Sequence, residues 1–251
     1  MTRLRLITWN LHGSAKPRID AVVELLQAHE PDLLALQEVR SGQARRIAGL
    51  LRWRRPAWSL KHNAWWPLWW RGEGLAVLSR HKLAVHPTVV LTPGVSKRSY
   101  ERRILVPAEV VLDDDLRVLL IDAHLSSGGT EEARRSEQAE HLLRLLPESP
   151  PSLVAGDLNA DPDRAPIRSL VNAGLVDAWA AAGTGPGHTI PANAPRRRID
   201  YVLAGPGVGV VEAAVLDDLG PAMAGLSDHR PVLAVLDVPS AEPPPPSAEP
   251  G

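Results

Sequence analysis

Residues 152–159 read Ser-Leu-Val-Ala-Gly-Asp-Leu-Asn, and the fold prediction for this chain starts from them. The short, mostly apolar run 152–155 predicts a buried strand. Asp157 and Asn159 follow that strand directly. In α/β proteins the ends of strands gather distant residues into one site, although an Asp and an Asn after a strand also form simple turns. The stretch alone leaves both interpretations open.

Five further motifs repeat this pattern of polar residues beside an apolar strand. In chain order they are Trp9-Asn10, Gln37-Glu38, Asp122-Ala123-His124, Arg198-Ile199-Asp200-Tyr201 and Ser227-Asp228-His229-Arg230-Pro231. Any one of them has an ordinary structural explanation, such as a helix cap, a core histidine or a surface ion pair. Six such motifs in one chain predict that the strand ends meet at a shared site.

Hydrophobic periodicity supplies the remaining elements. Strands are predicted at 4–9, 33–36, 75–78, 83–91, 104–112, 116–123, 152–155, 199–203, 208–216 and 231–238, and helices at 18–29, 42–51, 130–146 and 165–172. Thr130 is the expected N-cap of the third helix, and residues 113–115 are an expected hairpin turn. The stretch 52–74 has no clean period. Helices among hairpin-connected strands indicate an α/β protein with much antiparallel pairing.

Composition limits the class of protein. The 251 residues carry a net charge of -1 with a pI near 6.8, so no global basic field attracts nucleic acid. The chain has no cysteine, which excludes disulfides, thiolate zinc sites and cysteine nucleophiles. Any metal must be held by oxygen or imidazole.

The chain is expected to form one domain over residues 1–238, because no composition shift divides it earlier. Residues 239–251 consist of Pro, Ala, Glu, Ser and Gly and are expected to be a disordered Pro-rich tail. No signal peptide or membrane span is evident in the sequence. A cytoplasmic location is therefore the default expectation, and a monomer is expected.

The motifs suit the hydrolysis of phosphate esters. A phosphodiester is anionic and repels hydroxide, so catalysis requires positive charge near the phosphorus. Mg²⁺ prefers carboxylate and amide oxygens and keeps open positions for water. Imidazoles can donate hydrogen bonds to the charge that develops on the phosphoryl oxygens, and a carboxylate beside a histidine fixes its tautomer.

Taken together, the six motifs resemble those of the endonuclease/exonuclease/phosphatase superfamily, which includes pancreatic-type deoxyribonuclease. The resemblance spans residues 4–238. It implies a four-layer α/β/β/α sandwich with two packed mixed sheets and the site at one end of them. It also implies a magnesium-dependent hydrolase acting on phosphate esters, in which Mn²⁺ can substitute for Mg²⁺.

The resemblance assigns the metal and its surroundings residue by residue. Glu38 is similar to the principal magnesium ligand of the family, with Asn10 beside it. Asp228 resembles either the partner of His229 or a second metal ligand. These three residues are the expected metal ligands.

The resemblance also implies catalytic roles. Asp157 is similar to the group that orients or deprotonates the attacking water, and Asn159 to the amide that contacts the phosphate. His124 and His229 resemble the imidazoles that hold the phosphoryl oxygens. Asp200 matches a further acidic position whose role varies within the family.

Two features outside the motifs are candidates for substrate binding. Arg102 and Arg103 precede a predicted strand at a place where family members often contact a phosphate. Tryptophans crowd the stretch 53–70 among lysine and arginine side chains, and Trp65 and Trp66 are the expected contacts. They could stack on bases, lie at a lipid interface, or belong to an ordinary core.

The leading prediction of function is a phosphodiesterase or nuclease that uses a metal-activated water. The alternative is a lipid or small-molecule phosphoesterase, sphingomyelinase-like or phosphatase, with the tryptophan-rich stretch contacting a membrane or headgroup. A non-catalytic binding module is disfavoured, because none of the matching ligand residues is lost. The partner is therefore a phosphate-ester substrate, with nucleic acid as the first candidate.

Overall fold

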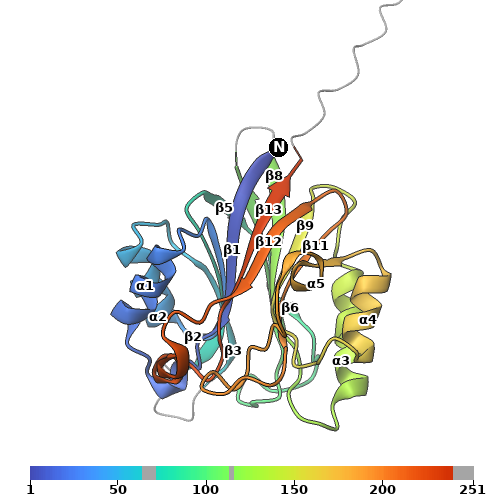
Figure 1. Ribbon diagram of the computed structural model, residues 1–251. Helices are drawn as coiled ribbons and strands as arrows, with labels where there is room; N and C mark the ends of the chain where they lie inside the picture. The colour runs from blue at the N-terminus through green and yellow to red at the C-terminus, as the bar shows by residue number, and fades with distance from the viewer. Residues whose placement is uncertain (64–71, 113–115, 240–251) are drawn as a thin grey trace, which may run out of the picture.

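The computed structural model describes residues 1–63, 72–112 and 116–239 of the chain. Within these ranges two mixed β-sheets pack face to face, and helices cover their outer sides (Figure 1). Four layers result, in the order helix, sheet, sheet, helix. The predicted fold, a four-layer α/β/β/α sandwich, is confirmed.

The first sheet has the strand order β12-β13-β1-β2-β4-β3. β1 and β2 are parallel, and the other neighbours are antiparallel. The strands are β1 Thr2–Asn10, β2 Leu33–Arg40, β3 Ala57–His62, β4 Glu73–Ser79, β12 Gly209–Val215 and β13 Val232–Val238. Helices α1 Ile19–Ala28 and α2 Ser41–Leu50 pack on its outer face.

The second sheet has the order β10-β11-β9-β8-β7-β5, and β6 also pairs with β7. β8 and β9 are parallel. The strands are β5 Lys82–Val85, β6 Val89–Val90, β7 Ile104–Val111, β8 Arg117–His124, β9 Ser152–Asp157, β10 Val176–Asp177 and β11 Asp200–Ala204. Helices α3 Glu132–Leu143 and α4 Ala165–Asn172 cover its outer face. The short elements are α5 Ala178–Ala182 and the 3₁₀ turns η1 Gly13–Ala15 and η3 Gly220–Gly225.

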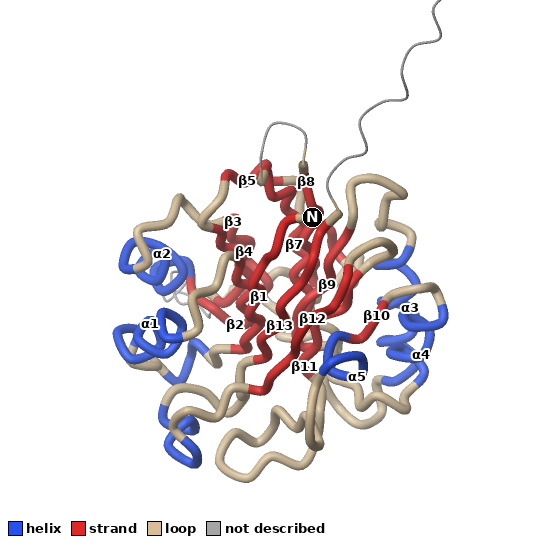
Figure 2. Tube along the Cα trace, turned by 45° about the horizontal axis from the view of Figure 1, so that its top comes forward, coloured by secondary structure: helices blue, strands red, loops and turns tan. Residues whose placement is uncertain are grey.

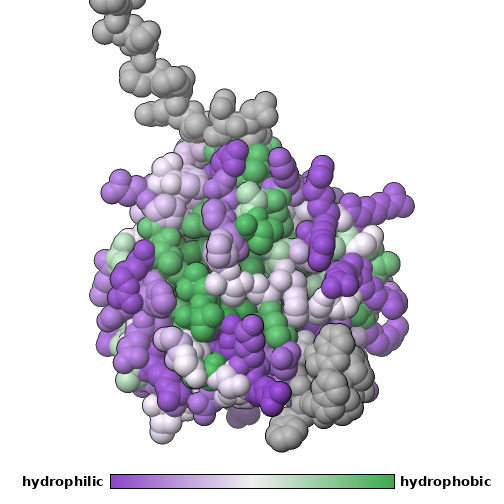
Figure 3. Space-filling model, turned by 180° about the vertical axis from the view of Figure 1, so that it is seen from behind, coloured by the Kyte–Doolittle hydropathy of each residue, from purple (hydrophilic) through white to green (hydrophobic). Residues whose placement is uncertain are grey.

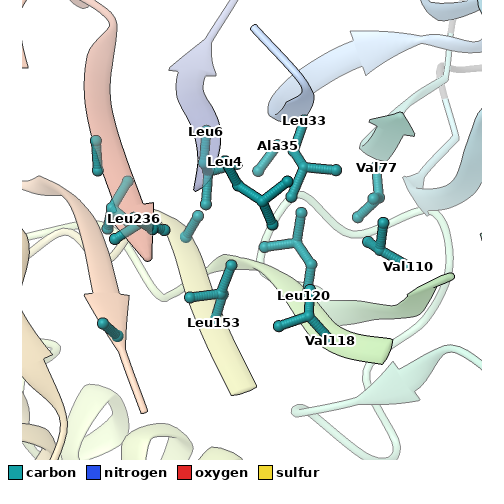
Figure 4. Packing of buried hydrophobic residues seen from close by; sticks show 14 of the residues in the cluster. Leu4, Leu6, Leu33, Ala35, Val77, Val110, Val118, Leu120, Leu153 and Leu236 are labelled. Atoms are coloured by element: carbon teal, nitrogen blue, oxygen red, sulfur yellow. The ribbon is translucent and has the colours of Figure 1, made fainter. Parts of the chain in front are cut away.

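The main core lies between the two sheets (Figure 4). Leu4 and Leu6 of β1 point into it and meet Leu120 and Leu153 of the other sheet, whereas Trp9 of β1 faces the helices. Side chains alternate between the faces of a strand, and both faces of these strands are buried. That explains why the strand sequences are almost continuously apolar. Each fully buried leucine contributes roughly 1.5–3 kcal/mol.

A buried carboxyl joins the two sheets. Asp122 of β8 accepts hydrogen bonds from the Gln37 side chain at 2.7 Å and from the Ala76 backbone amide at 3.1 Å. Burial raises the pKa of Asp122 well above its usual value. Gln37 and Asp122 belong to two of the sequence motifs, and here they fix one sheet against the other.

Several local predictions were wrong. The stretch 52–74, for which the absence of a clean period gave no predicted element, contains β3. The single strand predicted at 83–91 is split into β5 and β6 at Pro87, which cannot donate to a ladder. Helix α3 begins after Glu131, so Thr130 is not its N-cap. The other predicted elements are present (Figure 2). The helix predicted at 165–172 has those ends, and the ends of the others are shifted.

The expected hairpin turn at 113–115 and residues 240–251 of the expected tail lie outside the described residues, and the division into one domain and a tail stays a prediction. Among the described residues, no helix combines the length and apolar character needed to cross a membrane. The surface seen in Figure 3 carries hydrophilic side chains around a central apolar area. The cytoplasmic location expected from the sequence stays a prediction.

Candidate active site

Strand register brings three of the predicted residues into one row across the second sheet. His124 ends β8 and is paired with Asp157, which ends β9. On the other side of Asp157, Asp200 begins the antiparallel strand β11 and is paired with it. Residues 33 to 76 positions apart in the sequence thus lie together at one rim, with paired neighbours roughly one strand spacing apart. All three side chains are buried.

The first sheet contributes Asn10 to the same rim. Asn10 ends β1 and donates a hydrogen bond from Nδ2 to Asp157 Oδ2 over 3.1 Å. The Ser227 hydroxyl donates to the Asn10 carbonyl over 2.6 Å, which ties the last motif to β1. Asp157 is therefore the point at which the two sheets meet in the site.

Glu38 reaches the site through a distortion of β2. The strand does not end at Glu38, as the sequence suggested, but continues to Arg40 with a register shift between Leu36 and Val39. Glu38 has a φ of 52°, a left-handed conformation that a non-glycine residue rarely adopts. Such strain is found mostly where a site requires it. Its Oε1 lies 3.9 Å from Nε2 of His124.

His229 is held by Asp200 and not by Asp228. The Nδ1 atom of His229 lies 2.8 Å from Asp200 Oδ2, and its Nε2 lies 3.9 Å from Asp157 Oδ2. Burial alone would lower the pKa of His229, but the charge of Asp200 and its hydrogen bond outweigh it and raise that pKa to about 10. The imidazolium therefore presents Nε2–H toward Asp157.

The prediction that Asp228 partners His229 was wrong. The Asp228 side chain is half-exposed, and its Oδ1 lies 3.3 Å from Nδ1 of His12. Asp228 thus contacts the loop after β1, while its charge still contributes to the raised pKa of His229. The alternative role of Asp228, as a second metal ligand, stays a prediction.

The other two titratable groups of the row respond to burial. Burial, followed by the charge of Asp200, raises the pKa of Asp157 to about 7. Burial lowers the pKa of His124 well below its usual value, and the nearby cations Lys61 and Arg103 act in the same direction. His124 is thus a neutral imidazole between the carboxylates of Glu38 and Asp157, at 3.9 and 3.6 Å.

The donor atoms suit a hard divalent cation. Carboxylate oxygens of Asp157 and Asp200 and a ring nitrogen of His229 lie within 4.8 Å of one another, and the two carboxylates are the groups among them that can bind a cation while His229 is protonated. Oδ1 of Asp200 is buried without a hydrogen-bond partner among the described residues. Asn10 and Glu38 add amide and carboxylate oxygens at the same rim. An oxygen-rich set of this kind fits Mg²⁺ or Mn²⁺ and not a thiophilic metal.

Sequence reasoning missed Lys61, which lies on β3. Its side chain is fully buried, and Nζ lies 3.7 Å from Glu38 Oε1 and 4.8 Å from the ring centroid of Tyr100. Among the described residues Nζ has no hydrogen-bond partner. Burial, and next the charge of Arg103, lower the pKa of Lys61 to about 8. A lysine in a stretch without clear periodicity gave no signal that it would be buried beside a carboxylate.

Asn159 lies at the predicted place. Its backbone amide donates to Asp157 Oδ1 over 3.0 Å, and its side-chain amide donates to the Leu125 carbonyl over 3.1 Å. Its φ is 52°. The Gly-Asp-Leu-Asn motif therefore makes a local turn and also builds the site, so the two interpretations of the sequence both hold.

Arg102 and Arg103 are buried and bonded to backbone carbonyls. Arg102 donates to the carbonyls of Leu60 and Lys61, at 2.7 and 2.8 Å. Arg103 donates to the Leu125 carbonyl over 3.0 Å. These bonds fix β3 and the loop after β8 around the site, while phosphate contact by either arginine stays a prediction. Trp65 and Trp66 lie outside the described residues.

Three solved structures illustrate the similarity of this fold to known proteins. An endonuclease/exonuclease/phosphatase from Beutenbergia cavernae is 26% identical with a TM-score of 0.79, over 95% of this chain and 72% of that one. A mannosyl-6-phosphatase from Bacteroides thetaiotaomicron is 22% identical with a TM-score of 0.75, over 93% and 99%. The human Nocturnin catalytic domain is 21% identical with a TM-score of 0.69, over 94% and 95%.

The sequence itself gives the family. No curated protein matches the chain. A sequence model of the Endonuclease/Exonuclease/phosphatase family matches residues 7–229, a range that contains the first five motifs and ends at His229 within the sixth. With two packed mixed sheets and the motif residues gathered at one rim, this chain belongs to the Endonuclease/Exonuclease/phosphatase family, a family of phosphoesterases.

Proposed function

We propose that the chain is a magnesium-dependent phosphodiesterase in which water, and not a side chain, attacks the phosphorus. One observation carries the proposal: the Asp157 carboxylate contacts Asn10 from the other sheet and lies between His124 and His229. A carboxylate flanked by two imidazoles and an amide has the groups that water attack on a phosphate ester needs.

Glu38 and Asn10 would hold the metal, with Asp157 beside them. Their oxygens lie where both sheets end, and Lys61 Nζ lies 3.7 Å from Glu38 Oε1. A bound divalent cation would polarise a phosphoryl oxygen and stabilise charge on the leaving oxygen.

Side chains of the protein would carry out the remaining steps, which are activating the water and binding the phosphate. Asp157 orients the attacking water and accepts its proton as the new P–O bond forms. His229, held as an imidazolium by Asp200, donates from Nε2 to a phosphoryl oxygen. His124 contacts another phosphoryl oxygen, and the Asn159 amide binds the phosphate from the turn after β9.

Hydrolysis of bis(4-nitrophenyl) phosphate tests the proposal. We expect release of 4-nitrophenol with Mg²⁺ or Mn²⁺, none in excess EDTA, and recovery when metal is restored. The Asp157→Asn variant is expected to be inactive but folded. Unchanged turnover in EDTA would overturn the metal-dependent mechanism.

A phosphomonoester is the second candidate substrate class. One structural neighbour is named a mannosyl-6-phosphatase, and the net charge of -1 supplies no global attraction to nucleic acid. A panel of DNA, RNA, sugar phosphates and phospholipid vesicles ranks the classes by kcat/KM. Nucleic-acid binding, membrane contact and the monomeric state stay predictions.

A further inference from the structure

A polar cavity of about 330 Å³ lies beside Asn159, apart from the row of strand ends. Its walls come from the loop between β8 and α3, the first turn of α3, the loop between β9 and α4, and the segment before β11. The charged and amide side chains that line it are Arg135, Arg164, Arg197, Glu132, Asp161 and Asn159. We call it the arginine pocket.

Arg135 forms the inner wall of the arginine pocket. It is 5% exposed, and its Nη1 donates to the carbonyls of Ser126 and Gly128, at 3.0 and 2.8 Å. Its Nε is buried and has no hydrogen-bond partner among the described residues. A buried N–H without a partner costs free energy unless a bound group satisfies it. Arg135 thus lines the pocket and carries an unsatisfied donor.

Arg164 and Arg197 form the outer wall, and both are half-exposed. Arg197 forms two contacts with Asp161, from Nε at 3.0 Å and from Nη2 at 2.9 Å. Arg164 is held only loosely, because its Nη1 lies 3.6 Å from Glu132 Oε2. A guanidinium has five N–H donors, so both arginines keep donors free.

Charge in the arginine pocket favours an anion. Three guanidiniums and two carboxylates, Glu132 and Asp161, line the pocket, and Asp163, which does not line it, lies 3.9 Å from Arg164 Nε. Burial lowers the pKa of Arg135, the charges of Glu132 and Glu131 oppose this shift, and those of Arg197 and Arg164 add to it. The three cations are therefore close enough to repel one another. Arginine forks match phosphate geometry and bind it through parallel hydrogen bonds.

We infer that the arginine pocket is a subsite for a second phosphate group of the substrate, next to the phosphate that is hydrolysed. The inference rests on the proposed function, because Asn159 lines the pocket and also donates to Asp157. The preferred substrate then carries two phosphates, as a nucleic-acid segment or a bisphosphorylated small molecule does.

Two chromogenic diesters that differ only in a second phosphate test the subsite. They are thymidine 5′-(4-nitrophenyl phosphate) with and without a 3′-phosphate. We expect the wild-type protein to have the lower KM for the 3′-phosphorylated ester. The double variant Arg164→Gln/Arg197→Gln should raise that KM roughly tenfold, the factor expected for losing one charged hydrogen bond. Hydrolysis of the other ester should be unchanged.

Arg168→Gln is the matched control, since Arg168 is an exposed arginine of α4 that does not line the pocket. It should leave both KM values unchanged. Equal KM values for the two esters in the wild type, or equal losses on both in the double variant, would overturn the subsite. Hydrolysis of bis(4-nitrophenyl) phosphate under the same conditions tests the proposed function separately.

A binding measurement keeps the test independent of turnover. Sulfate is titrated into the metal-free wild-type protein while the arginine Nε–H resonances are followed by NMR. We expect the Arg135 resonance to shift with saturation and the shift to vanish in the double variant. A resonance that sulfate does not move overturns the subsite, even if the enzyme hydrolyses both esters.

Discussion

The imidazole of His229 and the carboxylate of Asp200 form a buried ion pair, with Nδ1 and Oδ2 2.8 Å apart although the residues are 29 positions apart in the sequence. His229 comes from the loop before β13 in the first sheet, and Asp200 from β11 in the second. The pair therefore depends on the packing of both sheets. In the proposed mechanism Asp200 acts through this pair by positioning His229.

The first prediction concerns this pair. Asp200→Asn keeps the shape of the side chain but removes its charge, so the pKa of His229 should fall toward its ordinary value and the imidazolium should be lost at neutral pH. We expect kcat for bis(4-nitrophenyl) phosphate to fall on the order of a hundredfold or more. Asp163→Asn, at an exposed aspartate, is the control and should keep full activity.

The second prediction is that Asp200→Asn changes how the stability of the fold depends on pH. The pKa of His229 is raised in the folded protein to about 10, from about 6.5 in the unfolded chain. The pair therefore stabilises the fold fully below about pH 6.5 and loses that contribution as pH rises toward about 10. Urea unfolding of both proteins without metal measures it. The stability advantage of the wild type should shrink across this range; an advantage that grows with pH would contradict the assignment.

Glu38 carries the prediction for the metal. We expect Glu38→Gln to weaken Mg²⁺ binding, measured by calorimetry, at least tenfold, because an amide is a weaker ligand than a carboxylate for a hard cation. Glu24→Gln, at an exposed glutamate of α1, is the control. The melting temperature should stay within the range of the control. Unchanged Mg²⁺ affinity would remove Glu38 from the ligand set.

Local sequence patterns predicted most of the fold. Apolar runs bounded by polar residues located the strands, because both faces of β1, β8 and β9 are buried and their residues must be apolar. The hydrophobic pattern failed to predict a strand where the residues of that strand do not look buried in the sequence but are buried by pairing with a neighbouring strand. β3 was missed because Lys61 lies within it, and a lysine is rarely buried without a salt bridge or hydrogen bond to stabilise it.

The sequence predicted which residues lie at the site better than it predicted which of them contact one another. Asn10, His124 and Asp157 lie together as the motifs suggested, since strand ends meet at a rim. The partner of His229 was misassigned to the adjacent Asp228. That role came from the resemblance. His229 precedes β13 of the first sheet and Asp200 begins β11 of the second, so only the packing of the two sheets shows that Asp200 faces His229.

We predict that replacing Lys61 lowers the activity of the protein without lowering its stability. Lys61→Met removes a buried ammonium that has no hydrogen-bond partner among the described residues, so the melting temperature should stay the same or rise. It also removes the cation 3.7 Å from Glu38, so kcat/KM for bis(4-nitrophenyl) phosphate should fall at least tenfold. Differential scanning fluorimetry and kinetics on the same preparation check both. A variant that loses stability and keeps full activity would show that Lys61 is structural.

The final prediction tests whether the close approach of β8 and β9 sets the site. Gly156 has a φ of 147°, and a Cβ added there would overlap the Ala123 carbonyl oxygen. Gly156→Ala should therefore separate His124 from Asp157, cost roughly 1–3 kcal/mol in unfolding free energy, and lower kcat about a hundredfold. Gly174→Ala is the control, because its φ is also positive, at 97°, but no atom lies within 4 Å of the added Cβ. It should lose some stability and keep its activity. If Gly156→Ala retains wild-type turnover, the spacing of these two strands does not determine catalysis.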